Sequence, residues 1–453
     1  MLFSFDTLAE WFPEHDGKRF AHIETVVLDS RKKARNGLFI PIVGERFNAH
    51  DFIEQAVENG AVAALWAKTE PAPAHLKSAC HFFYVDDTLA GLHQLATRYR
   101  NEVDPIVVGI TGSNGKTTTK DLVASVLSTT YKTHYTRGNF NNHIGLPQTI
   151  LEMPRDAEVL VVEMGMSSFG EIDRLTKIAR PDYAIVTNIG ESHIEFLGSR
   201  EGIAKAKLEI LNGLKENGVV IVDGDEPLLN NVPKKFETIR CGFSNDESVT
   251  YQIRDIALDI DSTSFSVNGK RYTIPLVGRH HAKNAAYVLA LAKKLNVTEE
   301  NIDIGFRKVQ HTGMRFEKME TKEGAVIIND AYNASPTSMM AAIDVIKSMP
   351  AFNKKILVLG DIFELGEQAE TFHKQIGKAI DETIDVVFTM GTNAKFISEE
   401  AKRLAPEKLR RHFADKYELV NALKPHLTKG VVVLFKASRG MAFENIVAEI
   451  ISA

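Results

Sequence analysis

The chain has 453 residues, 44% of them hydrophobic and 25% charged, and this length and composition predict about three globular domains. The net charge of −5 and the pI near 6.3 argue against a nucleic-acid partner, which usually requires a basic face. No apolar run approaches the roughly 18 residues of a membrane span, and the two cysteines lack CxxC spacing. The first twelve residues carry Asp6 and Glu10 within an apolar pattern, which fits an amphipathic helix better than a signal peptide. We therefore expect a cytoplasmic protein that binds no nucleic acid and does not insert into a membrane.

Residues 1–100 form the first predicted unit, in which short apolar runs alternate with helical stretches. We expect strands at 26–28, 38–40 and 82–85, and a helix at 51–59. The second unit, residues 101–312, alternates apolar strands and helices more regularly, which is typical of a parallel α/β sheet. Its expected strands are 106–110, 159–163, 183–187 and 219–222, with antiparallel hairpins added over 249–276.

Residues 313–453 form the third predicted unit, with the same alternation of strands and helices. Its expected strands are 325–329, 356–360, 386–390 and 431–435. Several of these runs are apolar on both faces, which suits strands covered by helices on both sides. The sequence thus predicts an α/β fold of three domains: a small N-terminal α/β domain, a central domain with a parallel sheet, and a C-terminal Rossmann-like domain.

Residues 106–121 read IVVGITGSNGKTTTKD, a strand that enters a glycine-rich turn and then a helix. Such a turn points backbone N–H groups at one spot, backed by the positive end of the helix dipole, and binds phosphate. Lys116 can neutralise phosphate oxygens and the hydroxyl of Thr117 can ligate Mg²⁺. The spacing departs from the standard P-loop, because Ile110 stands where the first glycine is expected. We interpret the segment as a variant nucleotide site rather than an ordinary turn.

Two further polar residues follow predicted strands of the same sheet. Glu163 ends the apolar strand 159–163, and ligands of open parallel sheets bind beyond the carboxyl ends of the strands. Its carboxylate is therefore placed to hold Mg²⁺, which takes oxygen ligands; the alternative is that it caps the following turn. His193 follows the next strand end, where a histidine is more often a structural hydrogen-bonding group than a ligand, so the ligand role is the less common interpretation.

Lys207 stands out when residues 203–214 are placed on a helix at about 100° per residue. It then falls in the middle of an apolar face, whereas Lys205 lies on the opposite side. The other members of that face are Ile203, Ile210, Leu211 and Leu214. Burial lowers the pKa of an amine, which leaves a neutral nucleophile that CO₂ can convert into a carbamate able to bind Mg²⁺. The alternative is a lysine that snorkels to a carboxylate.

Other polar residues at predicted strand ends, helix starts or hinges each have a plainer interpretation as loop, cap or surface ion pair. Asn142 is a polar-loop residue or a substrate contact, and His281 and Asn284 are helix-capping groups or ligands. Arg315 follows a predicted hinge, with a surface ion pair as its alternative, and Asp330 follows a strand, where an Asp commonly accepts from ribose hydroxyls.

Several segments together resemble the ATP-dependent Mur ligases of peptidoglycan synthesis. They are TGSNGKT (111–117), GNFNNHIGLP (138–147), EMG (163–165), NIGESHIEFLGSREGIAKAKLEI (188–210), GMRFE (313–317), NDAYNASPTSM (329–339) and KASRGM (436–441). Within that family, the loop LGDIFELG (359–366) and the lack of a DNPR motif favour the type that adds D-alanyl-D-alanine. One departure is the segment 48–52, which reads NAHDF where the family commonly has DGHDF, so the uridine contacts are less well fixed.

The resemblance implies that the three domains, 1–100, 101–312 and 313–453, bind the UDP-sugar, bind ATP and complete the ligase site. It implies that Lys116, His193 and Lys207 are catalytic and that Lys207 is carbamylated. Two Mg²⁺ ions would be held by Thr117, Glu163, His193 and Lys207.

The resemblance also implies contacts to the nucleotide and to the substrates. Those to ATP would come from Thr111, Gly112, Asn114, Gly115, Lys116, Thr117, Thr118, His281, Asn284, Arg315 and Asp330. Those to the substrates would come from Ser30, Arg31, Arg46, Asn142, Tyr332 and Asn333, with Lys436 and Arg439 as candidates for the dipeptide.

The implied reaction begins with phosphorylation of the carboxylate of UDP-N-acetylmuramoyl-tripeptide by ATP. The amine of D-alanyl-D-alanine then attacks the acyl phosphate. We expect a monomer. The alternatives are another Mur-type or folylpolyglutamate-type amide ligase, with a different acceptor, and a non-catalytic nucleotide-driven switch.

Overall fold

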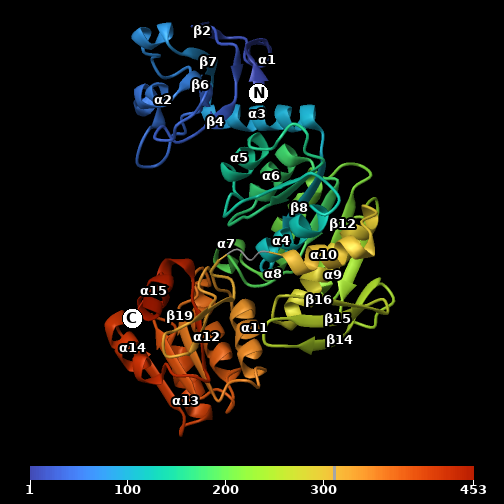
Figure 1. Ribbon diagram of the computed structural model, residues 1–453, viewed down its shortest axis with the longest axis vertical. Coiled ribbons are helices and arrows are strands. Elements are labelled where there is room, and N and C mark those ends of the chain that lie inside the picture. Colours follow the sequence, from blue (N-terminus) through green and yellow to red (C-terminus); the bar gives the residue numbers. More distant parts are fainter. Residues whose placement is uncertain (310–312, 453) are drawn as a thin grey trace.

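A computed structural model describes residues 1–309 and 313–452, and its helices and strands form three α/β domains arranged in a row (Figure 1). The N-terminal domain lies at one end, the central domain in the middle and the C-terminal domain at the other end. The predicted α/β class and three-domain architecture are therefore confirmed. The first predicted boundary, 100/101, falls within the last turn of α3 (Thr88–Val103). The second predicted boundary, between residues 312 and 313, adjoins residues 310–312, which lie outside the described part of the chain.

The N-terminal domain is built on a five-stranded sheet in the order β2-β7-β6-β5-β4, parallel except for β2. Its strands are β2 (His15–Gly17), β4 (Thr25–Val27), β5 (Gly37–Phe39), β6 (Ala61–Ala67) and β7 (His81–Val85), with a separate pair β1 (Phe3–Ser4) and β3 (His22–Ile23). Its helices are α1 (Phe5–Trp11), α2 (Ile53–Glu58) and α3. The expected N-terminal helix thus begins only at Phe5, where Ser4 caps it, because the two residues before α1 pair as a strand.

The central domain contains a nine-stranded sheet in the order β16-β15-β14-β13-β12-β11-β8-β10-β9. The parallel strands are β8 (Ile106–Thr111), β9 (Thr133–Tyr135), β10 (Val159–Glu163), β11 (Tyr183–Val186), β12 (Val219–Asp223) and β13 (Glu237–Gly242). The predicted hairpins are β14 (Tyr251–Leu258), β15 (Thr263–Val267) and β16 (Lys270–Ile274), and they are antiparallel. The helices are α4 (Lys116–Leu127), α5 (Gly145–Leu151), α6 (Glu171–Ala179), α7 (Ile194–Leu197), α8 (Arg200–Leu208), α9 (Arg279–Lys294) and α10 (Glu299–Lys308).

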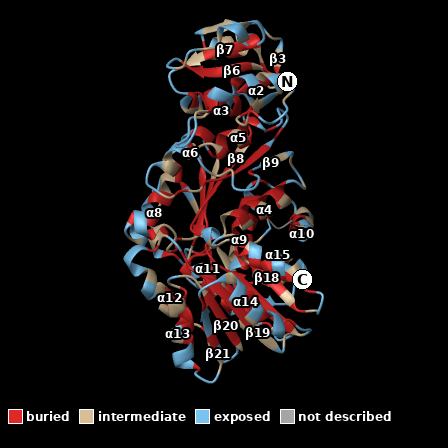
Figure 2. Ribbon diagram, turned by 90° about the vertical axis from the view of Figure 1, so that its left-hand side faces the viewer, coloured by how far each residue is buried: buried red, intermediate tan, exposed pale blue. Residues whose placement is uncertain are grey.

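The apolar runs of the central strands face two different cores, because successive side chains point to opposite faces of a sheet. Val107 and Leu160 join one core, which continues into the N-terminal domain, whereas Val108 and Val161 join the other, beneath α4 and α9. In Figure 2 these strands are buried, and exposed residues lie mainly on the helices and loops outside them. The register between β8 and its neighbours β10 and β11 brings all three carboxyl ends to one edge of the sheet.

The C-terminal domain has a six-stranded sheet in the order β17-β18-β22-β19-β20-β21, parallel except for β17. The strands are β17 (Glu317–Glu320), β18 (Val326–Asn329), β19 (Lys354–Gly360), β20 (Val386–Met390), β21 (Leu409–Phe413) and β22 (Val431–Lys436). The helices are α11 (Pro336–Lys347), α12 (Ala369–Lys378), α13 (Lys395–Leu404), α14 (Lys416–Leu423) and α15 (Glu444–Ser452). Among the helices described in all three domains, none is long and apolar enough to cross a membrane.

Candidate active site

The loop between β8 and α4 has the backbone geometry of a phosphate site. Gly112 has φ 147°, and an added Cβ would lie 1.9 Å from Thr187 Oγ1, so the chain passes closer to β11 than a side chain allows. Gly115 adopts φ 78° at the N-cap of α4 and gives the helix no side-chain cap. The first N–H groups of α4, at the positive end of its dipole, are therefore left for a ligand.

The backbone of Asn114 fixes this loop by hydrogen bonds, and its side chain points out of the loop. Its backbone N–H donates to Asn188 Oδ1 at 2.9 Å, and its carbonyl accepts from Thr187 Oγ1 at 2.6 Å. Its side-chain oxygen accepts from Ser335 Oγ, in the C-terminal domain, at 2.9 Å. Its side-chain nitrogen is buried and has no hydrogen-bond partner among the described residues. A buried amide donor without a partner at a phosphate loop points to an anionic ligand.

Lys116, the first residue of α4, folds back over the loop. Its Nζ donates to the carbonyl of Gly112 at 2.8 Å and lies 3.4 Å from that of Ser113. Desolvation lowers the pKa of Lys116, with the charge of Glu163 opposing this shift and that of Arg315 adding to it. A phosphate bound to the loop would therefore contact the ammonium of Lys116 and stabilise its positive charge.

Glu163, at the end of β10, is buried beside the same loop. Its carboxylate accepts from Thr117 Oγ1 and from Asn141 Nδ2, both at 2.9 Å. It therefore does not cap the following turn. A hydroxyl and a carboxylate in contact are oxygen donors that suit Mg²⁺, which proteins often bind through one or two carboxylates together with substrate phosphates. Within the described ranges, no three His, Cys, Asp or Glu side chains form a cluster that could hold a metal ion.

In the asparagine-rich segment before α5, the residue that contacts the site is not the asparagine that the sequence analysis singled out. Asn141, which the sequence did not single out, contacts Glu163. The predicted substrate residue Asn142 is exposed, and its Oδ1 accepts from the N–H groups of Ile144 and Gly145 at the start of α5. Its substrate role stays a prediction.

Lys207 lies in α8 with 2% of its surface exposed, whereas Lys205 on the same helix is exposed, as the helical periodicity predicts. Within residues 1–309 and 313–452 its ammonium has neither an ion pair nor a hydrogen bond, so the expected alternative of a carboxylate partner is not observed. Burial lowers the pKa of Lys207 well below its usual value, and the charge of Lys116 lowers it further. Burial therefore favours the neutral, nucleophilic form of the amine.

His193 precedes α7 and meets a residue of the C-terminal domain. Its Nδ1 contacts the carboxylate of Glu364, and this contact holds the pKa of Glu364 below its usual value. His193 Nδ1 thus faces a carboxylate, although the pair lacks the geometry of a regular hydrogen bond, and the other ring nitrogen, Nε2, is left for a ligand. Sequence reasoning missed Glu364, which belongs to the loop 359–366.

The predicted adenine residues lie on α9, next to the phosphate loop. Asn284 is buried, with its Nδ2 3.5 Å from His281 Nδ1. A Cβ on Gly115 would lie 2.8 Å from Asn284 Oδ1, so this amide packs directly on the loop. The backbone N–H of Gly278, the N-cap of α9, donates to Thr263 Oγ1 at 3.0 Å, and Asn284 lies beyond the first turn of the helix, so Asn284 is not a cap.

The C-terminal domain brings Arg315 and Asp330 toward the same region. The Arg315 guanidinium lies 4.2 Å from the centre of the Tyr332 ring, and its Nε is buried without a hydrogen-bond partner among the described residues. The expected surface ion pair of Arg315 is not formed within that part of the chain. Asp330 accepts from Lys436 Nζ at 2.6 Å, so Lys436 is engaged in a buried ion pair.

The other predicted residues of these two domains contact the site less directly. Thr111 Oγ1 donates to the carbonyl of Met164 at 3.0 Å, and Thr118 lies in the first turn of α4. Asn333 is exposed. Arg439 Nη1 lies 3.2 Å from Glu444 Oε1.

The predicted UDP-sugar residues lie in the N-terminal domain, away from the phosphate loop (Figure 1). Ser30 is buried and its Oγ donates to Gln55 Oε1 at 2.7 Å. Arg31 is exposed; its guanidinium makes two hydrogen bonds to Asp29 and its backbone N–H makes a third, and together they lower the pKa of that carboxyl to about 2. Arg46 is exposed.

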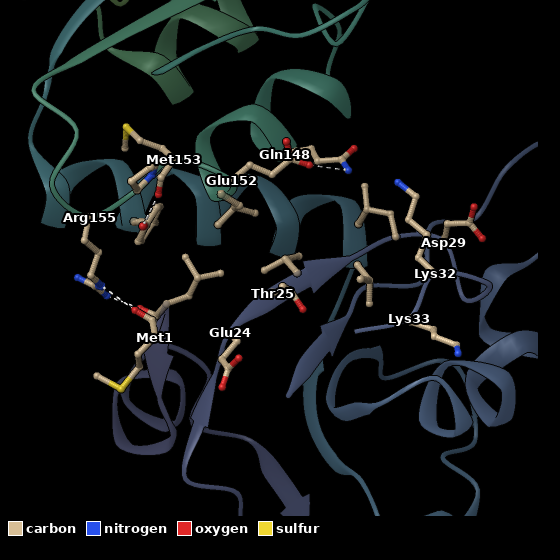
Figure 3. A pocket seen from close by; sticks show the side chains of 17 residues that line it. Met1, Glu24, Thr25, Asp29, Lys32, Lys33, Gln148, Glu152, Met153 and Arg155 are labelled. Atoms are coloured by element: carbon tan, nitrogen blue, oxygen red, sulfur yellow. Dashed lines mark hydrogen bonds between the residues drawn. The ribbon is translucent and has the colours of Figure 1, made fainter. Parts of the chain in front are cut away.

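A cavity of about 670 Å³ lies between the N-terminal and central domains (Figure 3). β4 and the residues after it form one wall, including Asp29 and Lys32, and Gln148 and Glu152 of the central domain form the other. No residue predicted to bind ATP lines this cavity. The structure therefore brings the nucleotide and metal residues together in one place and leaves the UDP-sugar residues in a separate region.

Comparison with known proteins agrees with this geometry. The Mur ligase middle domain family matches residues 110–292, and the Mur ligase glutamate ligase domain family matches residues 314–439. A UDP-N-acetylmuramoyl-tripeptide–D-alanyl-D-alanine ligase of Bacillus subtilis (strain 168) is 48% identical over 435 residues, which cover 95% of this chain and 94% of that protein.

Two solved structures extend the likeness to the whole fold. A crystal structure of MurF from Acinetobacter baumannii has a TM-score of 0.88 at 30% identity and covers 100% of this chain and 99% of its own. The structure of MurF ligase from Thermotoga maritima in complex with ADP has a TM-score of 0.82 at 31% identity, over 95% of this chain and 97% of its own. The site combines a phosphate loop, a buried Glu163 at the same sheet edge and a buried Lys207 that has no partner among the described residues. With these features and relatives of this identity along nearly its full length, the chain belongs to the Mur ligase family, in the group of UDP-N-acetylmuramoyl-tripeptide–D-alanyl-D-alanine ligases.

Proposed function

We propose that the chain is an ATP-dependent ligase that joins D-alanyl-D-alanine to the free carboxylate of UDP-N-acetylmuramoyl-tripeptide, in peptidoglycan precursor synthesis. The observation that carries this proposal is the convergence of Lys116, Glu163 and Lys207 beside a phosphate loop, in a chain that matches such ligases over 95% of its length. ATP and UDP-linked precursors are cytoplasmic compounds, so we place the reaction in the cytoplasm. We also propose that the chain acts as a monomer, and its net charge of −5 argues against a nucleic-acid partner.

The reaction has two steps in this proposal. The γ-phosphoryl group of ATP is transferred to a carboxylate oxygen of the tripeptide, which gives an acyl phosphate and ADP. The amine of the dipeptide then attacks the acyl carbon, loses a proton and forms the amide bond, and inorganic phosphate leaves. Both reactants of the first step are anions, so the protein mainly positions them and offsets their repulsion.

The chain's own groups supply this charge compensation. The N–H groups at the start of α4, the unpaired amide of Asn114 and the ammonium of Lys116 would bind the ATP phosphates. Thr117 and Glu163 would hold Mg²⁺, which when bound supplies positive charge between the two anions. Arg315, whose Nε has no partner within the described segments, would reach the phosphates from the C-terminal domain.

A carbamate on Lys207 is the finer part of the proposal. The neutral amine would attack CO₂, a nitrogen–carbon bond would form, and the nitrogen would lose a proton to solvent. The product would be an anion, which the charge of Lys116 would stabilise, and its oxygens, together with His193, would hold a second Mg²⁺. Support comes from the burial of Lys207 and from its lack of a carboxylate partner among the described residues.

The remaining contacts are proposed from the family resemblance and the placement of each residue. His281 and Asn284 would contact adenine, and Asp330 the ribose. Ser30, Arg31 and Arg46 would bind the UDP-sugar. Asn142, Tyr332 and Asn333 would line the substrate path.

The test is ADP release by the purified chain with UDP-N-acetylmuramoyl-tripeptides whose third residue is meso-diaminopimelate or lysine. We expect release to depend on both the tripeptide and D-alanyl-D-alanine. Turnover with a single amino acid in place of the dipeptide would instead identify another amide ligase. Nucleotide binding without any ADP release would identify a nucleotide-driven switch.

A further inference from the structure

The loop 361–366 of the C-terminal domain lies against the start of α7 of the central domain, at the junction of the two domains (Figure 1). The carboxylate of Glu364 contacts Nδ1 of His193. The carbonyl of Glu364 also accepts from the backbone N–H of Glu195 at 3.2 Å. Glu364 thus contacts the segment around His193 through both its side chain and its backbone.

Both partners of this contact have strained backbones. His193 has φ 65° and Glu364 has φ 62°, although neither is glycine. A residue other than glycine in this region is strained and persists only where the surroundings determine it. Such residues cluster at functional sites, and here the two strained residues face each other across a domain boundary.

The C-terminal domain fixes the loop that presents Glu364. The buried Asp361 carboxylate accepts from the backbone N–H groups of Thr392, Asn393 and Ala394 at 2.7–2.8 Å. Those bonds anchor the start of the loop, and the N–H of Phe363 donates to Ser438 Oγ at 2.9 Å. These hydrogen bonds hold the loop to the C-terminal domain, and from it Glu364 reaches the central domain with 41% of its side chain exposed.

We propose that Glu364 is a positioning residue that orients His193 for magnesium. A carboxylate on Nδ1 fixes the tautomer with the proton on Nδ1 and leaves the Nε2 lone pair free for a metal. Because His193 belongs to the central domain and Glu364 to the C-terminal domain, the imidazole is oriented only when the two domains are docked. The inference rests on the magnesium role of His193 proposed above.

Docking is supported at two other points of the same junction. Ser335 Oγ donates to Asn114 Oδ1 at 2.9 Å, and Thr337 Oγ1 donates to Glu191 Oε2 at 2.6 Å. Neither contact involves His193. Thr337 therefore offers a matched control, because Thr337→Val removes a hydrogen bond across the junction without touching the imidazole.

The test uses the full chain with Mn²⁺ in place of Mg²⁺ and a non-hydrolysable ATP analogue. Pulsed EPR detects nitrogen coupling from an imidazole bound to Mn²⁺, and we expect such coupling in the parent and its loss in His193→Ala. Glu364→Ala is expected to weaken or abolish it and to raise the Mg²⁺ concentration for half-maximal ADP release roughly 10- to 100-fold, as for other partners of metal-bound histidines. Glu364→Gln, whose amide oxygen still accepts from Nδ1, should restore the coupling, and Thr337→Val should retain it.

Two results would overturn the inference in different ways. Full coupling and an unchanged Mg²⁺ requirement in Glu364→Ala would show that His193 binds metal without help from Glu364. If the parent showed no nitrogen coupling, or showed coupling that His193→Ala retained, His193 would not bind the metal at all. Only the second result also contradicts the proposed magnesium role of His193, and neither affects the ADP-release assay that tests the ligase itself.

Discussion

The burial of the Lys207 side chain costs free energy of folding. Its ammonium lacks a partner among the described residues, and its neutral form is favoured by burial. We predict that Lys207→Met lowers the rate of ADP release by about 10²–10³-fold or more, as for loss of a charge-stabilising group. The free energy of unfolding should stay equal or rise by about 1 kcal/mol, because an apolar side chain of similar length suits the site better.

The exposed Lys205, on the same helix, provides the control. Lys205→Met should change neither the turnover nor the urea unfolding midpoint appreciably. Steady-state assays and urea titrations of both variants check the prediction, and millimolar bicarbonate should not rescue Lys207→Met. Substantial turnover by Lys207→Met would contradict the carbamate.

At the scale of single residues, the sequence predicted those parts of the site that a strand end or a helical period determines. Glu163 follows from the end of β10, and the burial of Lys207 follows from the apolar face of α8. Asn141 and Glu364 were missed for physical reasons. Which of two neighbouring asparagines turns inward depends on loop dihedrals, and Glu364 reaches His193 only through the docking of two domains.

Among the elements, the phosphate loop depends on the close passage of β8 and β11. We predict that Gly112→Ala destabilises the protein and abolishes ATP binding, because a Cβ at φ 147° would displace Thr187 Oγ1 from its hydrogen bond to the Asn114 carbonyl. Gly170→Ala is the matched control, since Gly170 also has positive φ (82°) but an added Cβ meets nothing within 4 Å. It should cost only the strain of about 1–3 kcal/mol and keep ATP affinity. Calorimetric titration with ATP and urea unfolding distinguish the two variants.

The loop 361–366 should also make part of the stability depend on pH. His373 is fully buried; its Nε2 accepts from the N–H of Ile362, and burial lowers its pKa below the usual value. The unfolded chain therefore takes up a proton as pH falls through about 6.5, whereas the folded chain resists until lower pH. Stability is thus lost on acidification through this range, and none of this loss occurs well above pH 6.5.

We predict that His373→Gln, which keeps an acceptor but does not titrate, loses less unfolding free energy than the parent between pH 7 and pH 5. Urea titrations of the two proteins at several pH values measure the difference. Parallel stability curves would show that His373 makes no contribution to the acid sensitivity.

The elements that the sequence predicted were those with long, continuous apolar runs, such as β8, β10, β19 and β22. Strands with charged residues were missed, among them β13 (ETIRCG), which lies between β14 and β12 inside its sheet, and β21 (LRRHF), an edge strand with one polar face. The alanine-rich β6 (AVAALWA) was missed because alanine favours helices locally. Its burial between β5 and β7 overrides that preference.

For the molecule as a whole, the junction between the N-terminal and central domains is a packed core rather than a flexible hinge. Tyr99 at the end of α3 is fully buried, its hydroxyl donates to the Met153 carbonyl at 2.6 Å, and its ring lies 5.4 Å from that of Phe3. The apolar core of the N-terminal domain continues through these residues to Leu146 and Ile150 of α5. The two domains should therefore unfold together.

We predict that Tyr99→Ala removes about 3–5 kcal/mol of this packing and separates the unfolding of the N-terminal domain from that of the rest. Calorimetry should show two heat transitions in place of one. If the N-terminal domain binds the UDP-sugar, the KM for the UDP-linked tripeptide should rise more than that for ATP, because the phosphate loop lies in the central domain. Tyr417→Ala, at a residue 74% exposed, is the control and should leave both the single transition and the two KM values unchanged. A single transition in Tyr99→Ala, with equal changes in both KM values, would show that the central domain supports the N-terminal domain through contacts other than this core.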